Sequence, residues 1–77
     1  MTIKILGSGC PACQLLEFQT QKAIQELGLK DVQIEHVYEI DKIIEYGVMS
    51  TPAIVIDGKV KAAGRIPDVV EIKSWLK

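Results

Sequence analysis

The chain has 77 residues, of which 48% are hydrophobic, and nine basic and ten acidic residues give it a net charge of −1. This length allows one domain, residues 1–77, with a small core of aliphatic side chains. The charges are scattered, which excludes a basic stripe for nucleic acid, and no apolar run approaches the ~20 residues of a membrane span. Residues 1–6 are too few for the apolar region of a signal peptide. We therefore expect a cytoplasmic protein without nucleic-acid or membrane partners.

The first half of the chain predicts a strand followed by a helix. Residues 2–6 are β-branched and apolar enough for a short strand, which Gly7-Ser8-Gly9 ends. A helix is predicted from near Cys10, with Pro11 in its first turn and Gly28 as its left-handed C-terminal cap. A spacing of about 100° per residue predicts a core-facing side. That side contains Cys13, Leu16, Thr20, Ala23, Ile24 and Leu27.

The middle of the chain predicts a second strand and a short helix. Residues 32–37 alternate between apolar and polar side chains with period two, which is typical of a strand. Ile40, Ile43 and Ile44 then form a short helical stripe that Gly47 closes.

The last third predicts a hairpin and a final helix. Residues 53–56 and 59–62 flank Asp57-Gly58, which tolerates the positive φ angles of a type I′ turn. Pro67 opens the last helix, whose apolar face contains Val69, Ile72 and Leu76, with Trp75 beside them. In the order βαβαββα, the βαβ half requires parallel pairing through a right-handed crossover, and the hairpin adds antiparallel strands. The predicted fold is α/β, with a four-stranded mixed sheet and helices on both faces.

The two cysteines form the motif Cys10-Pro11-Ala12-Cys13 at the predicted start of the first helix. Unpaired backbone N–H groups and the helix dipole favour a negative charge there, which stabilises a Cys10 thiolate. Cys13 lies one turn further on the core-facing side, where it is less accessible. We predict that Cys10 attacks a partner's disulfide and that Cys13 then attacks the Cys10 sulfur to release the reduced partner. No bound cofactor is implied, because the electrons reside on the sulfurs.

Other uses of the cysteine pair stay open at this point. A disulfide across four residues restrains little of the unfolded chain, so a purely structural role has little stabilising power. A zinc site needs about four ligands, and the one histidine, His36, falls on a predicted strand. A thiol-based carrier or sensor is the alternative of another class, with a soft metal or metalloid held by Cys10 and Cys13.

The chain resembles the thioredoxin superfamily, and in particular its short thioredoxin/glutaredoxin-like members called redox-active disulfide proteins. The resemblance covers essentially the whole chain. It rests on CPAC at 10–13, Thr51-Pro52 before the third strand, the Asp57-Gly58 hairpin, and Gly64 ahead of the last helix. It implies a thioredoxin-like fold and a cis Thr51–Pro52 bond against the cysteine pair, which leaves the Thr51 backbone to pair with an extended partner. It also implies that Pro11, Thr51, Pro52 and Gly64 contact the substrate.

The chain also departs from the family pattern. Thioredoxins commonly have Trp before the first cysteine and Gly-Pro within the motif, where this chain has Gly9 and Pro11-Ala12. Pro11-Ala12 is closer to glutaredoxins, so a glutathione-dependent glutaredoxin is the alternative enzyme. Residues 63–68 match the glutathione segment of glutaredoxins in part, and Asp68 there either caps the helix or meets a glutathione amine. The first strand lacks the buried aspartate that thioredoxins use for proton transfer, and its Lys4 is expected to face solvent.

The resemblance implies two kinds of partner. Disulfide-containing proteins would be the substrates, and a reductase or a low-molecular-weight thiol would be the electron donor. We expect a monomer. Leu15 and Phe18 lie opposite the core-facing side of the first helix, where they either pack on the last helix near Trp75 or form a docking or dimer surface.

Overall fold

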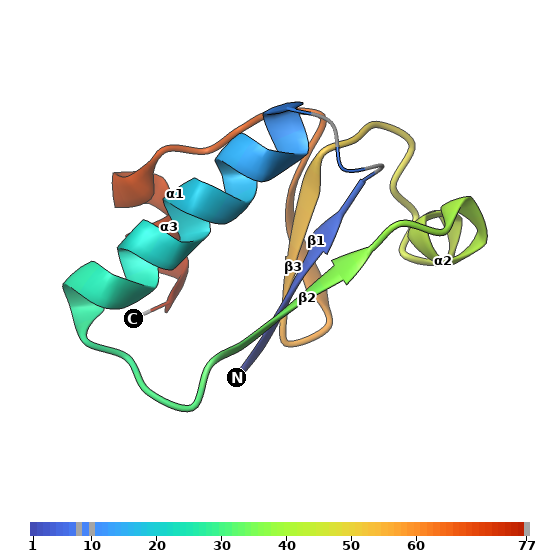
Figure 1. Cartoon of the computed structure of the whole chain (residues 1–77). Helices are drawn as coiled ribbons and strands as arrows, with labels where there is room; N and C mark the ends of the chain where they lie inside the picture. Colours follow the sequence, from blue (N-terminus) through green and yellow to red (C-terminus); the bar gives the residue numbers. More distant parts are fainter. Residues whose placement is uncertain (8, 10, 77) are drawn as a thin grey trace.

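The fold was analysed in a computed structural model that describes residues 1–7, 9 and 11–76. Its helices and strands follow the predicted order, and the four strands form one sheet in the order β2-β1-β3-β4 (Figure 1). The elements are β1 (Thr2–Leu6), α1 (Pro11–Leu27), β2 (Gln33–Val37), α2 (Ile40–Glu45), β3 (Ala53–Ile56), β4 (Lys59–Ala63) and α3 (Val69–Leu76).

The sheet is mixed, as predicted. β1 pairs in parallel with β2 and antiparallel with β3, and β4 pairs antiparallel with β3. The turn between β3 and β4 has positive φ angles at both central residues, 48° at Asp57 and 84° at Gly58. Both angles are those that a type I′ turn requires, so the predicted hairpin is confirmed.

Helix α1 ends at the predicted left-handed Gly28, and the hydrogen bonds there form a Schellman motif. Gly28 has a φ of 66° and its N–H donates to the Gln25 carbonyl at 3.1 Å, while the Leu29 N–H donates to the Ile24 carbonyl at 3.1 Å. These two bonds satisfy carbonyls that the end of a helix otherwise leaves unpaired. The buried residues of α1 are Cys13, Leu16, Thr20 and Ala23, all from the predicted core-facing side.

The strands carry apolar side chains on both faces of the sheet. Ile3 and Ile54 belong to the main core, which α1 and α3 cover side by side (Figure 1). Leu6 and Val55 belong to a second, smaller core on the opposite face, where they meet Ile43 of α2. The predicted helices on both faces are therefore confirmed. In the part of the chain that the structure describes, no helix combines the length and the apolar character needed to cross a membrane.

Candidate active site

The end of β1, the start of β3 and the end of β4 lie side by side at one end of the sheet. The register places the end of β1 beside the start of β3, and the start of β3 beside the end of β4. Gly7, Pro52 and Gly64 are the next residues beyond these ends. The Gly64 N–H donates to the Pro52 carbonyl at 2.9 Å, and the Gly7 N–H donates to the Val37 carbonyl at 3.0 Å. Backbone hydrogen bonds thus join the loops at Gly64 and Pro52 to each other and join Gly7 to the end of β2.

The sulfur of Cys13 lies against the backbone of Gly7 at this end of the sheet. Cys13 is 1% exposed in the first turn of α1, and a Cβ atom on Gly7 would overlap its Sγ atom. The same Cβ position is 3.8 Å from the Thr51 Cβ atom. A glycine is therefore required where the cysteine and Thr51 approach the end of β1. From the sequence alone, this glycine is recognisable only as the end of a strand.

The other predicted site residues lie as follows. The Thr51–Pro52 peptide bond is cis, which is the isomer that the resemblance implied; Thr51 is exposed and Pro52 is buried. Gly64 has a φ of 74°, and a Cβ atom there would meet the Ser50 Cβ atom at 2.8 Å. Pro11 is exposed as the first residue of α1. The prediction for Cys10 falls outside the described residues.

Lys4 lies on the face of the sheet opposite α1. Its Nζ atom donates a hydrogen bond to the Tyr46 hydroxyl at 3.0 Å and lies 4.0 Å from a Glu35 carboxylate oxygen. The hydrogen bond to Tyr46 raises the pKa of Lys4. Lys4 is therefore bound to Tyr46 on the face of the sheet that lies away from Cys13, and its side chain is partly exposed there.

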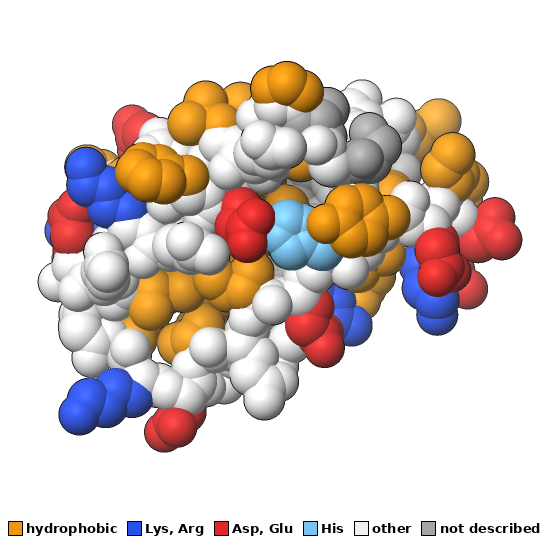
Figure 2. Space-filling model, in the orientation of Figure 1, with side chains coloured by type: hydrophobic (Ala, Val, Ile, Leu, Met, Phe, Trp, Pro, Cys, Tyr) orange, Lys and Arg blue, Asp and Glu red, His pale blue; other side chains and the backbone are white. Residues whose placement is uncertain are grey.

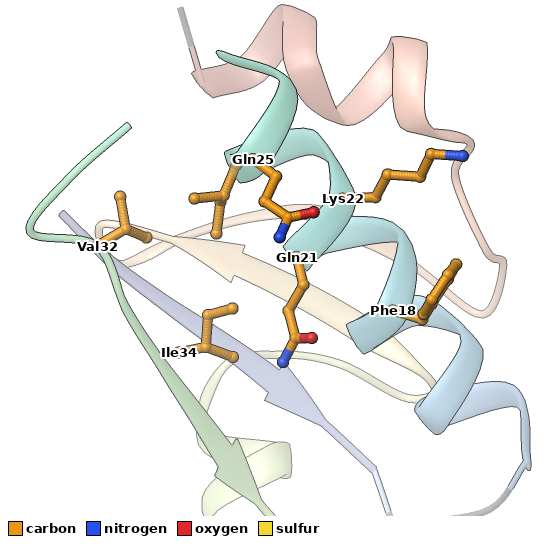
Figure 3. A pocket seen from close by; sticks show the side chains of 7 residues that line it. Phe18, Gln21, Lys22, Gln25, Val32 and Ile34 are labelled. Atoms are coloured by element: carbon orange, nitrogen blue, oxygen red, sulfur yellow. The ribbon is translucent and has the colours of Figure 1, made fainter. Parts of the chain in front are cut away.

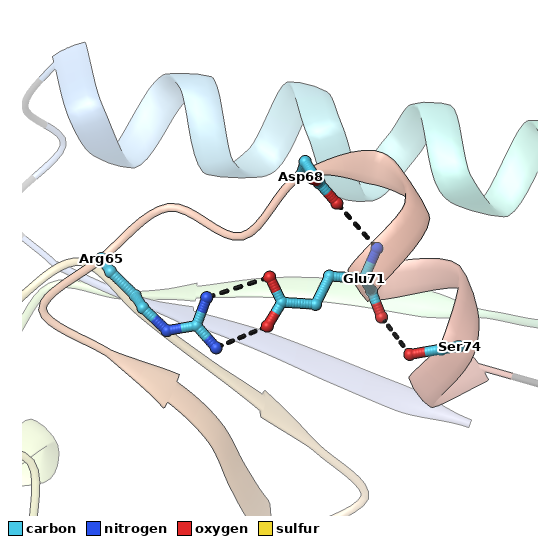
Figure 4. A network of polar contacts seen from close by, with 4 residues as sticks. All are labelled: Arg65, Asp68, Glu71 and Ser74. Atoms are coloured by element: carbon cyan, nitrogen blue, oxygen red, sulfur yellow. Dashed lines mark hydrogen bonds and ion pairs between the residues drawn. The ribbon is translucent and has the colours of Figure 1, made fainter.

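The two charged residues between β4 and α3, Arg65 and Asp68, both bind Glu71 in the first turn of α3 (Figure 4). Asp68 caps α3, because its Oδ1 atom accepts a hydrogen bond from the Glu71 N–H at 2.8 Å. Arg65 donates two hydrogen bonds to the Glu71 carboxylate, at 3.0 and 2.6 Å. The Arg65 hydrogen bonds lower the pKa of Glu71 and raise that of Arg65. Of the two roles open to Asp68, the structure shows capping.

The exposed side of α1 borders a groove. Leu15 and Phe18 are 48% and 61% exposed, so neither side chain is buried against another helix. In Figure 3, Gln21 points from α1 toward Ile34 of β2, whereas Phe18 points away, and Figure 2 shows apolar side chains at the bottom of this hollow. The groove is lined by Phe18, Gln21, Lys22, Ile24, Gln25, Val32 and Ile34.

A second groove lies along α2 and reaches the candidate active site. Of the predicted stripe on this helix only Ile43 is buried, while Ile40 and Ile44 are 70% and 62% exposed, and Met49 is 98% exposed. The groove also includes Thr51, and it is called the α2 groove below. Its lining residues are Ile40, Ile43, Ile44, Gly47, Val48, Met49 and Thr51.

Comparison with known proteins gives the same classification as the motif. A family model described as a thioredoxin domain matches residues 1–77. The chain belongs to the thioredoxin family. It is 41% identical over 76 residues to a thioredoxin of Methanothermobacter thermautotrophicus, covering 99% of this chain and 97% of that one. It is 39% identical over 77 residues to a thioredoxin of Methanocaldococcus jannaschii, covering 100% and 87%.

Membership of the thioredoxin family supports the general class that the sequence predicted, a thiol–disulfide oxidoreductase. The predicted thioredoxin-like fold is confirmed as well. Among residues 1–7, 9 and 11–76, no group of three or more His, Cys, Asp or Glu side chains is placed to hold a metal ion.

We predict that Gly7→Ala slows disulfide exchange because its methyl group displaces the Cys13 sulfur. Gly28→Ala is the matched control: it has no neighbour within 4 Å, but a φ of 66° makes alanine unfavourable there, by ~1–2 kcal/mol. Both variants should lose thermal stability. Only Gly7→Ala should also reduce a small disulfide more slowly, by at least about threefold. Equal exchange rates for the two folded variants would contradict the role given to Gly7.

We predict that Asp68→Ala lowers the free energy of unfolding by ~0.5–2 kcal/mol, because it leaves the Glu71 N–H without its cap. Asp68→Asn keeps a capping oxygen and should remain close to the native protein in urea unfolding at pH 7. If both variants unfolded like the native chain but lost a glutathione-dependent activity, Asp68 would belong to a glutathione site instead.

Proposed function

We propose that this protein reduces disulfide bonds in other proteins of the cytoplasm, with the Cys10–Cys13 pair as its redox group and no other bound cofactor. The observation that carries the proposal is the position of Cys13. Its sulfur is buried in the first turn of α1, against Gly7, while Thr51 beside it is exposed. A buried second thiol next to an exposed backbone segment suits a resolving cysteine beside a substrate-binding edge.

In the first step the Cys10 thiolate attacks one sulfur of the partner's disulfide. The partner's S–S bond breaks, its other sulfur leaves as a thiolate and takes up a proton, and a mixed disulfide joins Cys10 to the partner. Cys10 precedes the first residue of α1, and the positive end of the helix dipole favours the thiolate there.

In the second step the Cys13 thiolate attacks the Cys10 sulfur. The mixed disulfide breaks, the partner's remaining sulfur leaves as a thiolate and is protonated, and the Cys10–Cys13 disulfide forms. The partner has then gained two electrons and two protons. Burial of Cys13 supports this order, since a folded partner cannot reach a sulfur that is 1% exposed. A reductase or a low-molecular-weight thiol then returns the pair to the dithiol.

The α2 groove supports a protein rather than a small thiol as the substrate. Thr51 lines one end of the groove, and it also lies beside Gly7, which Cys13 contacts. An extended segment that pairs with the Thr51 backbone would continue over Ile44 and Met49. We therefore propose a substrate segment with an apolar side chain a few residues from its disulfide cysteine. The engagement of Asp68 and Arg65 around α3 is a further reason to prefer this over the glutaredoxin alternative.

We predict that Cys13→Ser accumulates a mixed disulfide with an oxidised protein substrate, because the resolving thiol is missing. Cys10→Ser should trap none. The adduct is detected by non-reducing electrophoresis and mass spectrometry, and dithiothreitol should release it. A glutaredoxin that uses one thiol would instead keep glutathione-disulfide activity in Cys13→Ser. A metal or metalloid carrier would lose its ion in both variants and trap no partner.

We predict that Ile44→Asp lowers kcat/KM for reduction of insulin at least about tenfold, since loss of one buried isoleucine contact is worth ~1.5–3 kcal/mol. The rate with oxidised glutathione should stay native, because so small a disulfide does not reach along α2. Val70→Asp is the control, since Val70 is 75% exposed on α3. Equal losses on both substrates would show that the α2 groove does not bind the partner.

A further inference from the structure

Tyr38 lies against the loop that leads into the cysteine motif. It follows the end of β2, and its ring atoms Cε1 and Cδ1 are 3.3 and 3.9 Å from the position of a Cβ atom on Gly9. A side chain at position 9 would therefore press on this ring, so Tyr38 faces the side of Gly9 where other residues carry a Cβ atom. Gly9 directly precedes Cys10.

Gly9 is also held from other directions. Its φ of 83° is a left-handed conformation, and its carbonyl accepts a hydrogen bond from the Gln14 side-chain amide at 3.3 Å. The same loop is anchored to β2 by the hydrogen bond from the Gly7 N–H to the Val37 carbonyl. The Tyr38 ring thus limits one more side of a loop whose backbone is already hydrogen-bonded to α1 and to β2.

Two further residues hold the Tyr38 ring in place. The ring is stacked on His36, with centroids 5.4 Å apart and planes at 18°, because residues two apart on an extended chain share a face. His36 Nε2 in turn lies 2.7 Å from Glu17 Oε2, on α1 one turn beyond Cys13. In Figure 2 the histidine lies at the centre of the visible face, between an acidic and an apolar side chain. Contacts therefore run from α1 through His36 to Tyr38, whose ring faces Gly9.

This arrangement bears on the closing of the disulfide. A disulfide forms only when the two Cβ atoms are ~3.5–4.5 Å apart. Cys13 is fixed by α1 and by Gly7. Cys10 directly follows Gly9 in the sequence, and a segment loses conformational entropy when it is held in one position. A neighbour that restricts Gly9 before the disulfide forms would reduce this loss, and so it would stabilise the disulfide relative to the dithiol.

We propose that Tyr38 is a positioning residue for the Cys10–Cys13 pair. Its ring restrains the loop at Gly9, and His36 with Glu17 orients the ring. This role rests on the proposed function, because it acts on the equilibrium between the dithiol and the disulfide of that pair.

The test compares the reduction potentials of Tyr38→Ala, Tyr38→Phe and the native chain in graded dithiothreitol buffers. In Tyr38→Ala the equilibrium constant for disulfide formation should fall about three- to tenfold, which makes the potential ~15–30 mV less negative. Tyr38→Phe should match the native value, because the atoms that face Gly9 are ring carbons, which phenylalanine keeps. Phe18→Ala is the matched control, since Phe18 is an aromatic residue of similar exposure, 61% against 55%.

A second variant keeps the test decisive if Tyr38→Ala does not fold. His36→Ala leaves the ring but removes its stacking partner, so its potential should shift in the same direction by a smaller amount. A native potential in folded Tyr38→Ala, or in His36→Ala where Tyr38→Ala is unfolded, would overturn the role of Tyr38 and leave the proposed function intact. A native protein that forms no reversible intramolecular disulfide would overturn the proposed function, and this inference with it.

Discussion

The sulfur of Cys13 lies directly against the backbone of Gly7, and the geometry of the candidate site depends on this close approach. The contact can form only if α1 begins near the end of β1, which brings Cys13 to this end of the sheet. The antiparallel register between β1 and β3 then places Thr51 on the other side of Gly7. A side chain at position 7 would separate the Cys13 sulfur from the Thr51 segment that is proposed to bind the substrate.

The two apolar cores explain why this end of the sheet is held in a defined geometry in so short a chain. β3 is buried along its whole length, because Ile54 and Ile56 face α1 and α3 while Ala53 and Val55 face the second core. The central strands β1 and β3 thus have apolar partners on both faces, and their register is strongly specified. The loops that continue these strands therefore begin at well-defined positions, although the loops themselves lie at the surface.

The exposed apolar side chains gather where the core ends. α2 has six residues, and the second core takes up only Ile43, which leaves Ile40 and Ile44 at the surface beside Met49. Burial of these side chains in the monomer would favour folding, but their exposure next to Thr51 provides a surface that an extended apolar segment can cover. The charged segment around Arg65 and Asp68 is different, because its groups are already bound to α3.

The sequence alone determined the order of the elements, the Gly28 helix end, the Asp57-Gly58 turn and the motif at 10–13, because each depends on residues adjacent in the chain or on a regular spacing. It did not reveal the role of Gly7, the exposure of Phe18 and Ile44, or the contacts from Glu17 to Tyr38. These were decided by the tertiary structure, since each depends on which distant segments meet and on how much surface a short helix can cover. Periodicity identifies an apolar face, but only packing determines whether another part of the chain covers it.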